Sequence, residues 1–369
     1  MTNKDSVKPI EEQRRMGLST DSLIDLRSLD IEEMGNFTAS MGFESYRAKQ
    51  LFQWVHKKGI DTFSQMSDMP LAYRQKLEEK AFLAPVREVT ASCSAAGDTV
   101  KTLLQLKDGE RIEMALMLYH RKNTRERATC CLSVQTGCAM ACSFCATALC
   151  GKGRNLSAGE IVAQALLADR KARDMGFAAL TNVVYMGMGE PLANLANVKK
   201  SLLLLNHPLG MNIGMRRMTV STCGLVPQIY EMADWGMQVE LAISLHASND
   251  ELRHSLMPVA ARYPLKELLA ACRYYRQKTG RRITFEYALF LGINDSAKFA
   301  HELGMLLKGE DFLLNIIPAN IVPETGFYPS KVEAIKDFSN TVAGYGIEIC
   351  MRESRGPDID AACGQLRRR

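Results

Sequence analysis

The sequence lacks the features that would send the chain to or through a membrane. None of its apolar runs reaches the roughly 18 residues that a membrane-spanning helix needs. Its start, MTNKDSVKPIEEQRRMG, is charged and is not followed by the apolar stretch of a signal peptide. Sequence repeats and low-complexity segments are also missing. We therefore expect a cytoplasmic protein without a membrane partner.

The cysteines lack the pattern of a disulfide scaffold. There are 11 of them, an odd number at uneven spacings in a chain of 369 residues. Secreted disulfide frameworks are short and carry paired cysteines, so a reducing compartment fits better, with the thiols available for metal or redox chemistry. The net charge of +5 permits a polyanionic partner without requiring one.

Composition and periodicity divide the chain into five parts. Residues 1–21 are polar and aperiodic, which predicts a loose tail. Residues 22–82 carry apolar residues at helical spacing and predict a small helical accessory domain. Residues 83–125 alternate around two glycine turns, which predicts a short β-extension. We expect a partial barrel over residues 126–345 and a C-terminal segment over residues 346–369.

Strand-like and helical runs alternate from Cys130 onward. A helix beginning at Ser157 opens with the capping box that Ser157 forms with Glu160. Alternation of this kind predicts an α/β fold, here a partial (β/α)6 barrel whose site lies at the carboxyl ends of the strands. The six predicted strands are CCLSVQ, NVVYMGMG, RMTVST, VELAISLH, ITFEYALF and FLLNIIPAN.

Three cysteines follow the first predicted strand in a C-x-x-x-C-x-x-C run. Cys138, Cys142 and Cys145 are close enough to face one point from a single loop. A structural zinc site usually has four ligands in two separated pairs, and no second C-x-x-C or H-x-x-x-H is present. Zinc with a fourth ligand from Cys131 or Cys150 remains an alternative. An iron–sulfur cluster held by three thiolates would leave one iron open for a substrate.

Polar residues or glycines recur where the later strands end. Glycine lets a backbone approach a ligand closely, and a carboxylate can accept a hydrogen bond from an ammonium group. Recurrence at successive strand ends favours one shared binding site. The residues are Gly189, Glu190, Ser221, Ser244, Leu245, His246 and Asn320.

The three-cysteine loop after the first barrel strand resembles the radical S-adenosylmethionine superfamily. A closer resemblance, from about Ser22 to the C-terminus, is to the RlmN and Cfr methyltransferases, which methylate adenosine carbons in RNA. The sequence Gly189-Glu190-Pro191 resembles the RlmN branch. The segments that carry the resemblance are CLSVQTGCAMACSFCAT, NVVYMGMGEPLANL, STCGLVPQI, AISLHASNDELRHSLMPV, EYALFLGINDS and DIDAACGQL.

The resemblance implies a role for each matching residue. Cys363 would carry a methyl group, Cys131 would resolve the protein–RNA link through a transient disulfide with Cys363, and Glu113 would be the general base. A [4Fe-4S] cluster would be held by the three loop cysteines. S-adenosylmethionine, two molecules per turnover, would be bound by Gly189, Glu190, Ser221, Ser244, Leu245, His246 and Asn320.

Some positions leave alternatives open. Cys130 lies beside Cys131, and because strand neighbours point to opposite faces, only one of the two can face the site. Cys150 has no assigned role. The segment PANIVPETG, which contains Asn320, departs from the family's usual P-W-N-P pattern, and the loop YHRKNTRER after Glu113 is longer than usual.

The resemblance also implies binding partners, and two alternative functions remain. The expected partners are 23S rRNA at the peptidyl-transferase centre, tRNA at the adenosine 3′ of the anticodon, and an electron donor such as flavodoxin; we expect a monomer. Alternatives are a Cfr-type enzyme that methylates C8 and a non-catalytic zinc-stabilised RNA-binding protein. Candidate phosphate contacts are Arg47, Lys49, Lys57, Lys58, Arg121, Lys122, Arg125, Arg127 and the arginines at 367–369.

Overall fold

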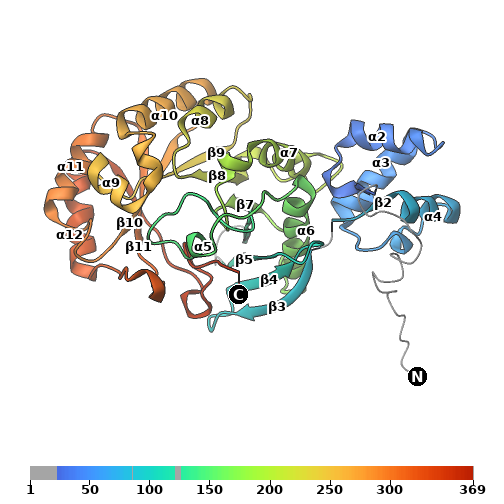
Figure 1. Ribbon diagram of the computed structural model, residues 1–369, viewed down its shortest axis with the longest axis horizontal. Coiled ribbons are helices and arrows are strands. Elements are labelled where there is room, and N and C mark those ends of the chain that lie inside the picture. Colours follow the sequence, from blue (N-terminus) through green and yellow to red (C-terminus); the bar gives the residue numbers. More distant parts are fainter. Residues whose placement is uncertain (1–22, 85, 121–125, 369) are drawn as a thin grey trace.

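The computed structural model describes residues 23–84, 86–120 and 126–368, and it has a helical region beside a larger α/β body (Figure 1). The predicted loose tail lies outside the described residues. So do Arg121, Lys122, Arg125 and Arg369 among the candidate phosphate contacts. No helix of the described ranges is both long and apolar enough to cross a membrane.

The N-terminal region is helical, as predicted, but begins differently. Its first predicted helix starts only at Ile31, because Asp30 and Glu33 form a capping box there; a short strand and a 3-10 turn over Leu26–Ser28 precede it. Phe52 and Trp54 are buried in this region's core. The elements are β1 (Ile24–Asp25), α2 (Ile31–Ser40), α3 (Tyr46–Gln53), α4 (Leu71–Lys80) and β2 (Ala81–Phe82).

One ten-stranded sheet organises the rest of the described chain. The strands follow the order β12-β11-β10-β9-β8-β7-β6-β5-β4-β3; β3 to β6 pair antiparallel, and β6 to β12 pair parallel. The bounds are β3 (Arg87–Cys93), β4 (Thr99–Gln105), β5 (Arg111–Tyr119), β6 (Arg127–Cys131), β7 (Asn182–Tyr185), β8 (Met218–Thr222), β9 (Glu240–Ser244), β10 (Ile283–Leu289), β11 (Phe312–Pro318) and β12 (Glu348–Met351).

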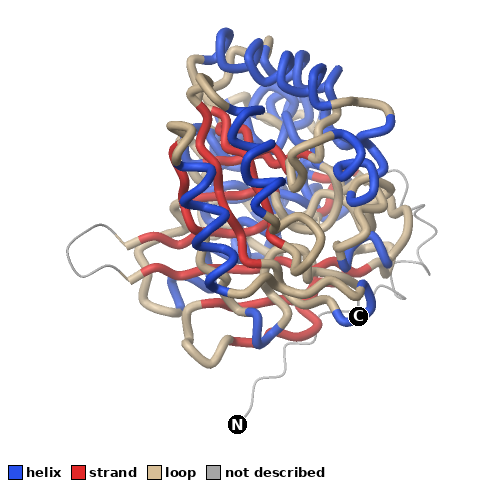
Figure 2. Tube along the Cα trace, turned by 90° about the vertical axis from the view of Figure 1, so that its left-hand side faces the viewer, coloured by secondary structure: helices blue, strands red, loops and turns tan. Residues whose placement is uncertain are grey.

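Helices cover the outside of the parallel strands, so the partial α/β barrel is confirmed (Figures 1 and 2). All six predicted strands are present, although the first begins earlier, at Arg127. Each outer helix buries an apolar stripe against the sheet. The helices are α5 (Ala146–Leu149), α6 (Ala158–Asp174), α7 (Leu195–Asn206), α8 (Val226–Ala233), α9 (Asp250–Leu256), α10 (Leu265–Thr279), α11 (Ala297–Leu307) and α12 (Val332–Ala343).

A seventh parallel strand, β12, was not predicted. It is short, mostly exposed and lies at the edge of the sheet against β11. An edge strand of this kind has no buried face, and therefore no apolar alternation that the sequence could display. β12 brings the start of the C-terminal segment onto the barrel.

The start of α6 anchors the N-terminal region to the barrel. The buried Asp25 carboxylate accepts hydrogen bonds from Ser28 Oγ (2.6 Å) and from the N–H groups of Arg27 and Ala84 (both 3.0 Å). Gly159 N–H in turn donates to Ser28 Oγ (2.9 Å). A Cβ atom at Gly159 would overlap Asp25 and would lie 2.7 Å from Ser28 Oγ, so the contact requires glycine.

Replacing Gly159 by alanine should therefore destabilise the protein, although alanine is the better helix former. We expect the free energy of unfolding to fall by about 1–3 kcal/mol, as in overpacked cores. The matched control is Gly35→Ala in α2, where a Cβ would have no neighbour within 4 Å; it should gain about 0.5–1 kcal/mol. Urea unfolding measures both, and an unchanged or raised stability in Gly159→Ala would contradict the close contact.

Candidate functional site

Two adjoining cavities occupy the mouth and the inner face of the barrel. The smaller, about 170 Å³, is lined by the three loop cysteines and by residues from successive strand ends. The larger, about 810 Å³, runs along the inner face of the sheet and contains Cys131 and Arg352. Cys145, Asn320 and Cys363 line both cavities. The predicted site residues therefore gather at one end of the barrel.

The cysteine loop connects β6 to α5 and is held by its backbone. Cys138 N–H donates to Gly151 O (3.0 Å), and Ser143 N–H donates to Leu256 O at the end of α9 (3.0 Å). Burial raises the pKa of Cys138 to about 12 and also raises the pKa of Cys142, and neighbouring thiols raise both further. Such thiols ionise only when a strong positive charge is supplied, as a bound metal group does.

The predicted donor set consists of three thiols, the ligand type that binds iron–sulfur clusters. Within the described residues, no group of three or more His, Cys, Asp or Glu side chains lies close enough to hold a metal ion. The smaller cavity is lined by all three loop cysteines, Cys138, Cys142 and Cys145. Cys150, a possible fourth zinc ligand, has a different partner, because its Sγ accepts a hydrogen bond from Arg368 N–H (3.4 Å).

The turn after β7 places a buried carboxylate in the smaller cavity. Glu190 Oε1 and Oε2 accept hydrogen bonds from the N–H groups of Leu192 and Cys223 (both 2.9 Å), and burial raises the pKa of Glu190. Gly189 has a φ of 98°, and a Cβ there would lie 2.5 Å from Gln135 Cβ. The glycine is thus required by close approach to the chain after β6, and it directs Glu190 inward.

His246 follows β9 in a strained conformation with a φ of 54°. Its Nδ1 accepts a hydrogen bond from Ala288 N–H (2.9 Å), and Asn294 Nδ2 donates to its carbonyl oxygen (2.9 Å). Burial lowers the pKa of His246 to about 3, so the ring is neutral. With Nδ1 as acceptor, we assign the proton to Nε2, which can donate to a ligand in the smaller cavity.

The remaining predicted strand-end residues divide into two groups. Ser221 and Ser244 line the smaller cavity. Leu245 does not line either cavity; it is fully buried in the main core, and its N–H donates to Glu286 O (3.0 Å). Asn320 lines both cavities, although the sequence around it departs from the family pattern.

The C-terminal segment folds back onto the cysteine loop. Gly364 O accepts a hydrogen bond from Ala146 N–H (2.8 Å), and Leu366 O accepts one from Thr147 Oγ1 (2.6 Å). Asn320 Nδ2 donates to Cys363 O (3.1 Å). These contacts hold the Cys363 thiol where the two cavities join.

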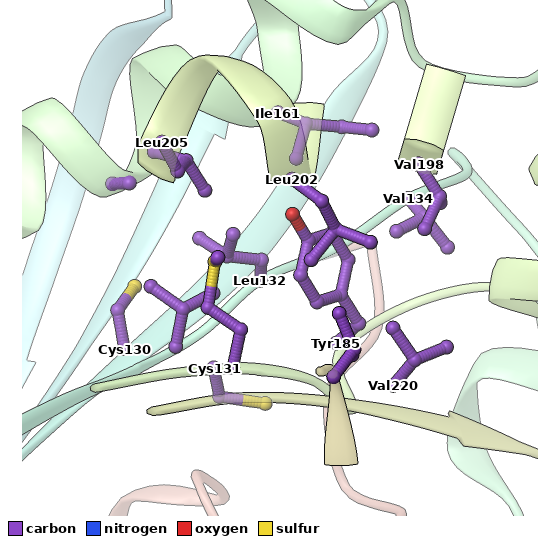
Figure 3. Close-up of a cluster of buried hydrophobic side chains, with 14 of the residues drawn as sticks. Cys130, Cys131, Leu132, Val134, Ile161, Tyr185, Val198, Leu202, Leu205 and Val220 are labelled. Atoms are coloured by element: carbon purple, nitrogen blue, oxygen red, sulfur yellow. The ribbon is translucent and has the colours of Figure 1, made fainter. Parts of the chain in front are cut away.

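Cys131 and Cys130 point to opposite sides of β6, as strand geometry requires (Figure 3). Cys131 lines the larger cavity, whereas Cys130 is fully buried among the apolar side chains beneath the outer helices. Burial raises the pKa of Cys131 to about 12, and the nearby Cys363 thiol raises it further. Cys131, and not its neighbour, therefore shares a cavity with Cys363.

An ion pair that was not predicted from the sequence shares the larger cavity with these two thiols. Arg352 Nη1 pairs with Glu286 Oε1 at 3.1 Å, and both residues line the larger cavity. Burial raises the pKa of Cys363, and the Arg352 guanidinium opposes that rise. A sequence signal existed, because the inner-face Glu286 within the apolar run ITFEYALF is a buried charge that needs a partner.

Glu113 lies near the cavities but lines neither of them. Its carboxylate is 4% exposed, accepts a hydrogen bond from Arg367 N–H (2.9 Å) and pairs with Lys101 Nζ (3.4 Å). Burial raises its pKa. The C-terminal segment therefore covers the residue that was predicted to be a base.

The C-terminal arginines were predicted to contact phosphate groups, but the two that the structure describes are paired with carboxylates of the same chain. Arg367 pairs with Glu324 (2.6 Å), and Arg368 pairs with Glu110 and donates to Cys150 O (2.9 Å). These ion pairs help to hold the segment in place. The described candidates on the N-terminal helices include three exposed lysines, Lys49, Lys57 and Lys58.

Comparisons with known proteins agree with this arrangement. The family model of the radical SAM superfamily matches residues 132–303, and that of the ribosomal RNA large subunit methyltransferase N-terminal domain matches residues 24–83. A probable dual-specificity RNA methyltransferase RlmN from Thermoanaerobacter sp. (strain X514) is 44% identical over 94% of this chain and 98% of its own. The one from Moorella thermoacetica is 47% identical over 93% and 97%.

A solved structure is also similar over most of its length. The crystal structure of a radical SAM methyltransferase from Sphaerobacter thermophilus matches with a TM-score of 0.89 and 45% identity. The match covers 93% of this chain and 99% of that one.

Removing the Arg352 charge should make Cys363 less reactive. Because only the thiolate reacts with iodoacetamide, Arg352→Met should slow alkylation of Cys363 at pH 8 by about tenfold for each unit that its pKa rises. The control is Arg355→Met, which also removes a charge from the larger cavity but pairs with Asp98. Peptide mass spectrometry gives the rates, and equal slowing in both variants would contradict a specific effect of Arg352.

Proposed function

Because the chain belongs to the RlmN family of radical S-adenosylmethionine RNA methyltransferases, we propose that it methylates C2 of adenosine in two RNAs. These are 23S rRNA, at the peptidyl-transferase centre, and tRNA, at the adenosine 3′ of the anticodon. The cofactors are a [4Fe-4S] cluster and S-adenosylmethionine. The observation that carries the proposal is the position of Cys363, which shares one cavity with the loop cysteines and another with Cys131.

The proposed chemistry explains why a radical route is used. Adenine C2 is electrophilic and has no lone pair with which to attack a sulfonium methyl group. When bound, the cluster supplies one electron that cleaves S-adenosylmethionine and yields a carbon radical. The protein must therefore bind, orient and shield the reactants, and then release the product.

The smaller cavity supplies groups suited to the cosubstrate. Cys138, Cys142 and Cys145 would hold the cluster. The Glu190 carboxylate would accept hydrogen bonds from the ammonium group, and neutral His246 would donate from Nε2. Ser221, Ser244 and Asn320 would complete the polar lining. Leu245 would act through its backbone and its packing, because its side chain lies in the core.

Cys363 would carry the methyl group in this mechanism. Its thiolate, stabilised by Arg352, takes a methyl group from one S-adenosylmethionine. The carbon radical from the second S-adenosylmethionine would take a hydrogen atom from the S-methyl group, and the methylene radical that remains would add to adenine C2. The new carbon–carbon bond joins RNA to protein until the carbon–sulfur bond is broken.

Cys131 and Glu113 would complete the reaction. One electron would return from the adduct to the oxidised cluster, and the Glu113 carboxylate would take the C2 proton. The Cys131 thiolate attacks Cys363 Sγ, so that a disulfide forms while the carbon–sulfur bond breaks and the departing carbon takes up a proton. An external thiol then reduces the disulfide. Since Arg367 N–H occupies Glu113 Oε2, this role requires residues 366–368 to shift when RNA binds.

The larger cavity is the proposed adenosine site. Its volume of about 810 Å³ accommodates a flipped nucleotide. Tyr119 and Arg127 lie on its wall, with the guanidinium 3.9 Å from the ring centre, and offer stacking and cationic groups. Exposed lysines on the N-terminal helices would contact phosphates. The electron donor would be a small redox protein such as flavodoxin.

Mass spectrometry of RNA nucleosides tests the position of methylation. We expect 2-methyladenosine to disappear from 23S rRNA and tRNA when the gene is deleted, and to return when the chain is expressed again. Methylation at C8 is the rival reaction. Loss of 8-methyladenosine with unchanged 2-methyladenosine would overturn the proposal, and loss from only one RNA would restrict its substrate.

Two neighbouring cysteines provide a matched test of the resolving step. Cys131→Ala should accumulate a covalent protein–RNA adduct and release no product, because no thiol remains to attack Cys363. Cys130→Ala removes a similar sulfur from the opposite face of β6 and should keep product release. Denaturing gels with labelled RNA report the adduct. Turnover by Cys131→Ala, or an adduct in Cys130→Ala, would exclude the assignment.

A further inference from the structure

Arg253, on α9, is a buried cation outside the roles described above. Its side chain is fully buried, with a relative exposure of 0%. Nη2 donates to Cys223 O (2.6 Å) and Nη1 to Tyr263 O (3.2 Å), whereas Nε has no hydrogen-bond partner. Over the described part of the chain, no carboxylate lies within ion-pair distance of this guanidinium.

Such an arrangement is unfavourable unless a counter-charge is supplied. A desolvated guanidinium loses its hydration, and carbonyl dipoles replace that hydration only partly. Burial accordingly lowers the pKa of Arg253. Buried arginines are ordinarily paired with an anion. The Asp250 carboxylate favours the charged form only from beyond ion-pair distance, so the described residues supply no close counter-charge.

Arg27 shows the contrast within the same molecule. It is also buried, with 3% exposure, and it also donates to two carbonyls, those of Ala84 (2.6 Å) and Ile60 (2.8 Å). Its guanidinium additionally pairs with Asp61 at 3.3 Å. Arg27 is thus a buried structural arginine with its own counter-charge, which Arg253 lacks.

Arg253 is connected directly to the cysteine loop. Its carbonyl accepts a hydrogen bond from Met257 N–H (2.7 Å), and Met257 packs in one apolar cluster with Cys142 and lines the smaller cavity. The adjacent Leu256 O accepts from both Ser143 N–H (3.0 Å) and Ser143 Oγ (3.2 Å). The end of α9, the helix that carries Arg253, therefore holds the cysteine loop through Ser143, which lies between the second and third cysteines.

A second connection leads to the cosubstrate side of the cavity. The carbonyl oxygen of Cys223 accepts from Arg253, and the N–H of the same residue donates to Glu190 Oε2 (2.9 Å). Cys223, which lines the smaller cavity, is thus held between the guanidinium and the Glu190 carboxylate. One buried cation orients groups on both sides of the smaller cavity.

We propose that the thiolate-ligated cluster is the close counter-charge of Arg253, which acts as a positioning residue behind the cavity wall and favours the reduced cluster. The thiolates make the cluster site anionic, and reduction adds one more negative charge beside a fixed cation. The inference rests on cluster binding and is independent of which carbon of adenine is methylated.

Thermal unfolding with and without the cluster measures the coupling. Wild-type protein and Arg253→Met are compared as full-length apoprotein and after anaerobic reconstitution, with iron and sulfide content as the loading check. We expect loading to raise the melting temperature clearly less in Arg253→Met than in wild type. Arg27→Met is the control; it should lower the melting temperature of both forms equally and leave the gain on loading unchanged.

The reduction potential provides a readout that a purely structural role would not move. In Arg253→Gln the one-electron reduction equilibrium should shift against the reduced cluster by at least tenfold, about 59 mV toward more negative potential. Arg253→Lys keeps the charge and should restore most of the shift. Spectroscopic redox titration measures all three proteins without RNA, so the result is separate from methylation.

The outcomes that overturn the inference are definite. Equal gains on loading in wild type and Arg253→Met, or equal potentials in wild type and Arg253→Gln, would make Arg253 a hydrogen-bond donor only. If both neutral variants failed to fold as apoproteins, the residue would be a structural requirement of the fold, and the inference would also be wrong.

Discussion

The docking of residues 363–367 onto the cysteine loop is the interaction on which the site depends. Two main-chain carbonyls, those of Gly364 and Leu366, accept hydrogen bonds from Ala146 and Thr147, at the start of α5. The thiol of Cys363 is thereby held where the two cavities join. Backbone acceptors of the segment make these contacts, and the ion pairs of Arg367 and Arg368 hold its end in place.

Around that contact, the site is a balance of buried charge. Glu190 is held by peptide N–H groups, and Glu286 is paired with Arg352. Arg253 has only carbonyl partners. In a low dielectric each of these groups acts strongly on its neighbours. The buried charges around the cavities thus suit ligands that carry both an ammonium group and an anionic centre.

The sequence predicted the six central strands and the cysteine loop because these rest on local patterns. Spacing in the loop and the capping box at Ser157 can be read without knowing the fold. Prediction from the sequence failed where a residue's important contact is with a residue far away in the chain. The edge strand β12 has no buried face, Arg352 pairs with Glu286 across 66 residues of sequence, and Glu113 is covered by a backbone N–H from Arg367. None of these three features produces a periodic pattern of apolar residues in the sequence.

The opposite orientation of Cys130 and Cys131 has a consequence for how the protein can vary. The two thiols are chemically alike. Only their alternating positions along β6 decide that Cys131 faces the larger cavity and Cys130 faces the apolar core. Pairing with β5 on one side and β7 on the other fixes these positions. An insertion of one residue before Cys130 within β6 would exchange the faces of the two sulfurs although both cysteines remain. Substitutions in this strand should thus be tolerated more readily than changes of its length.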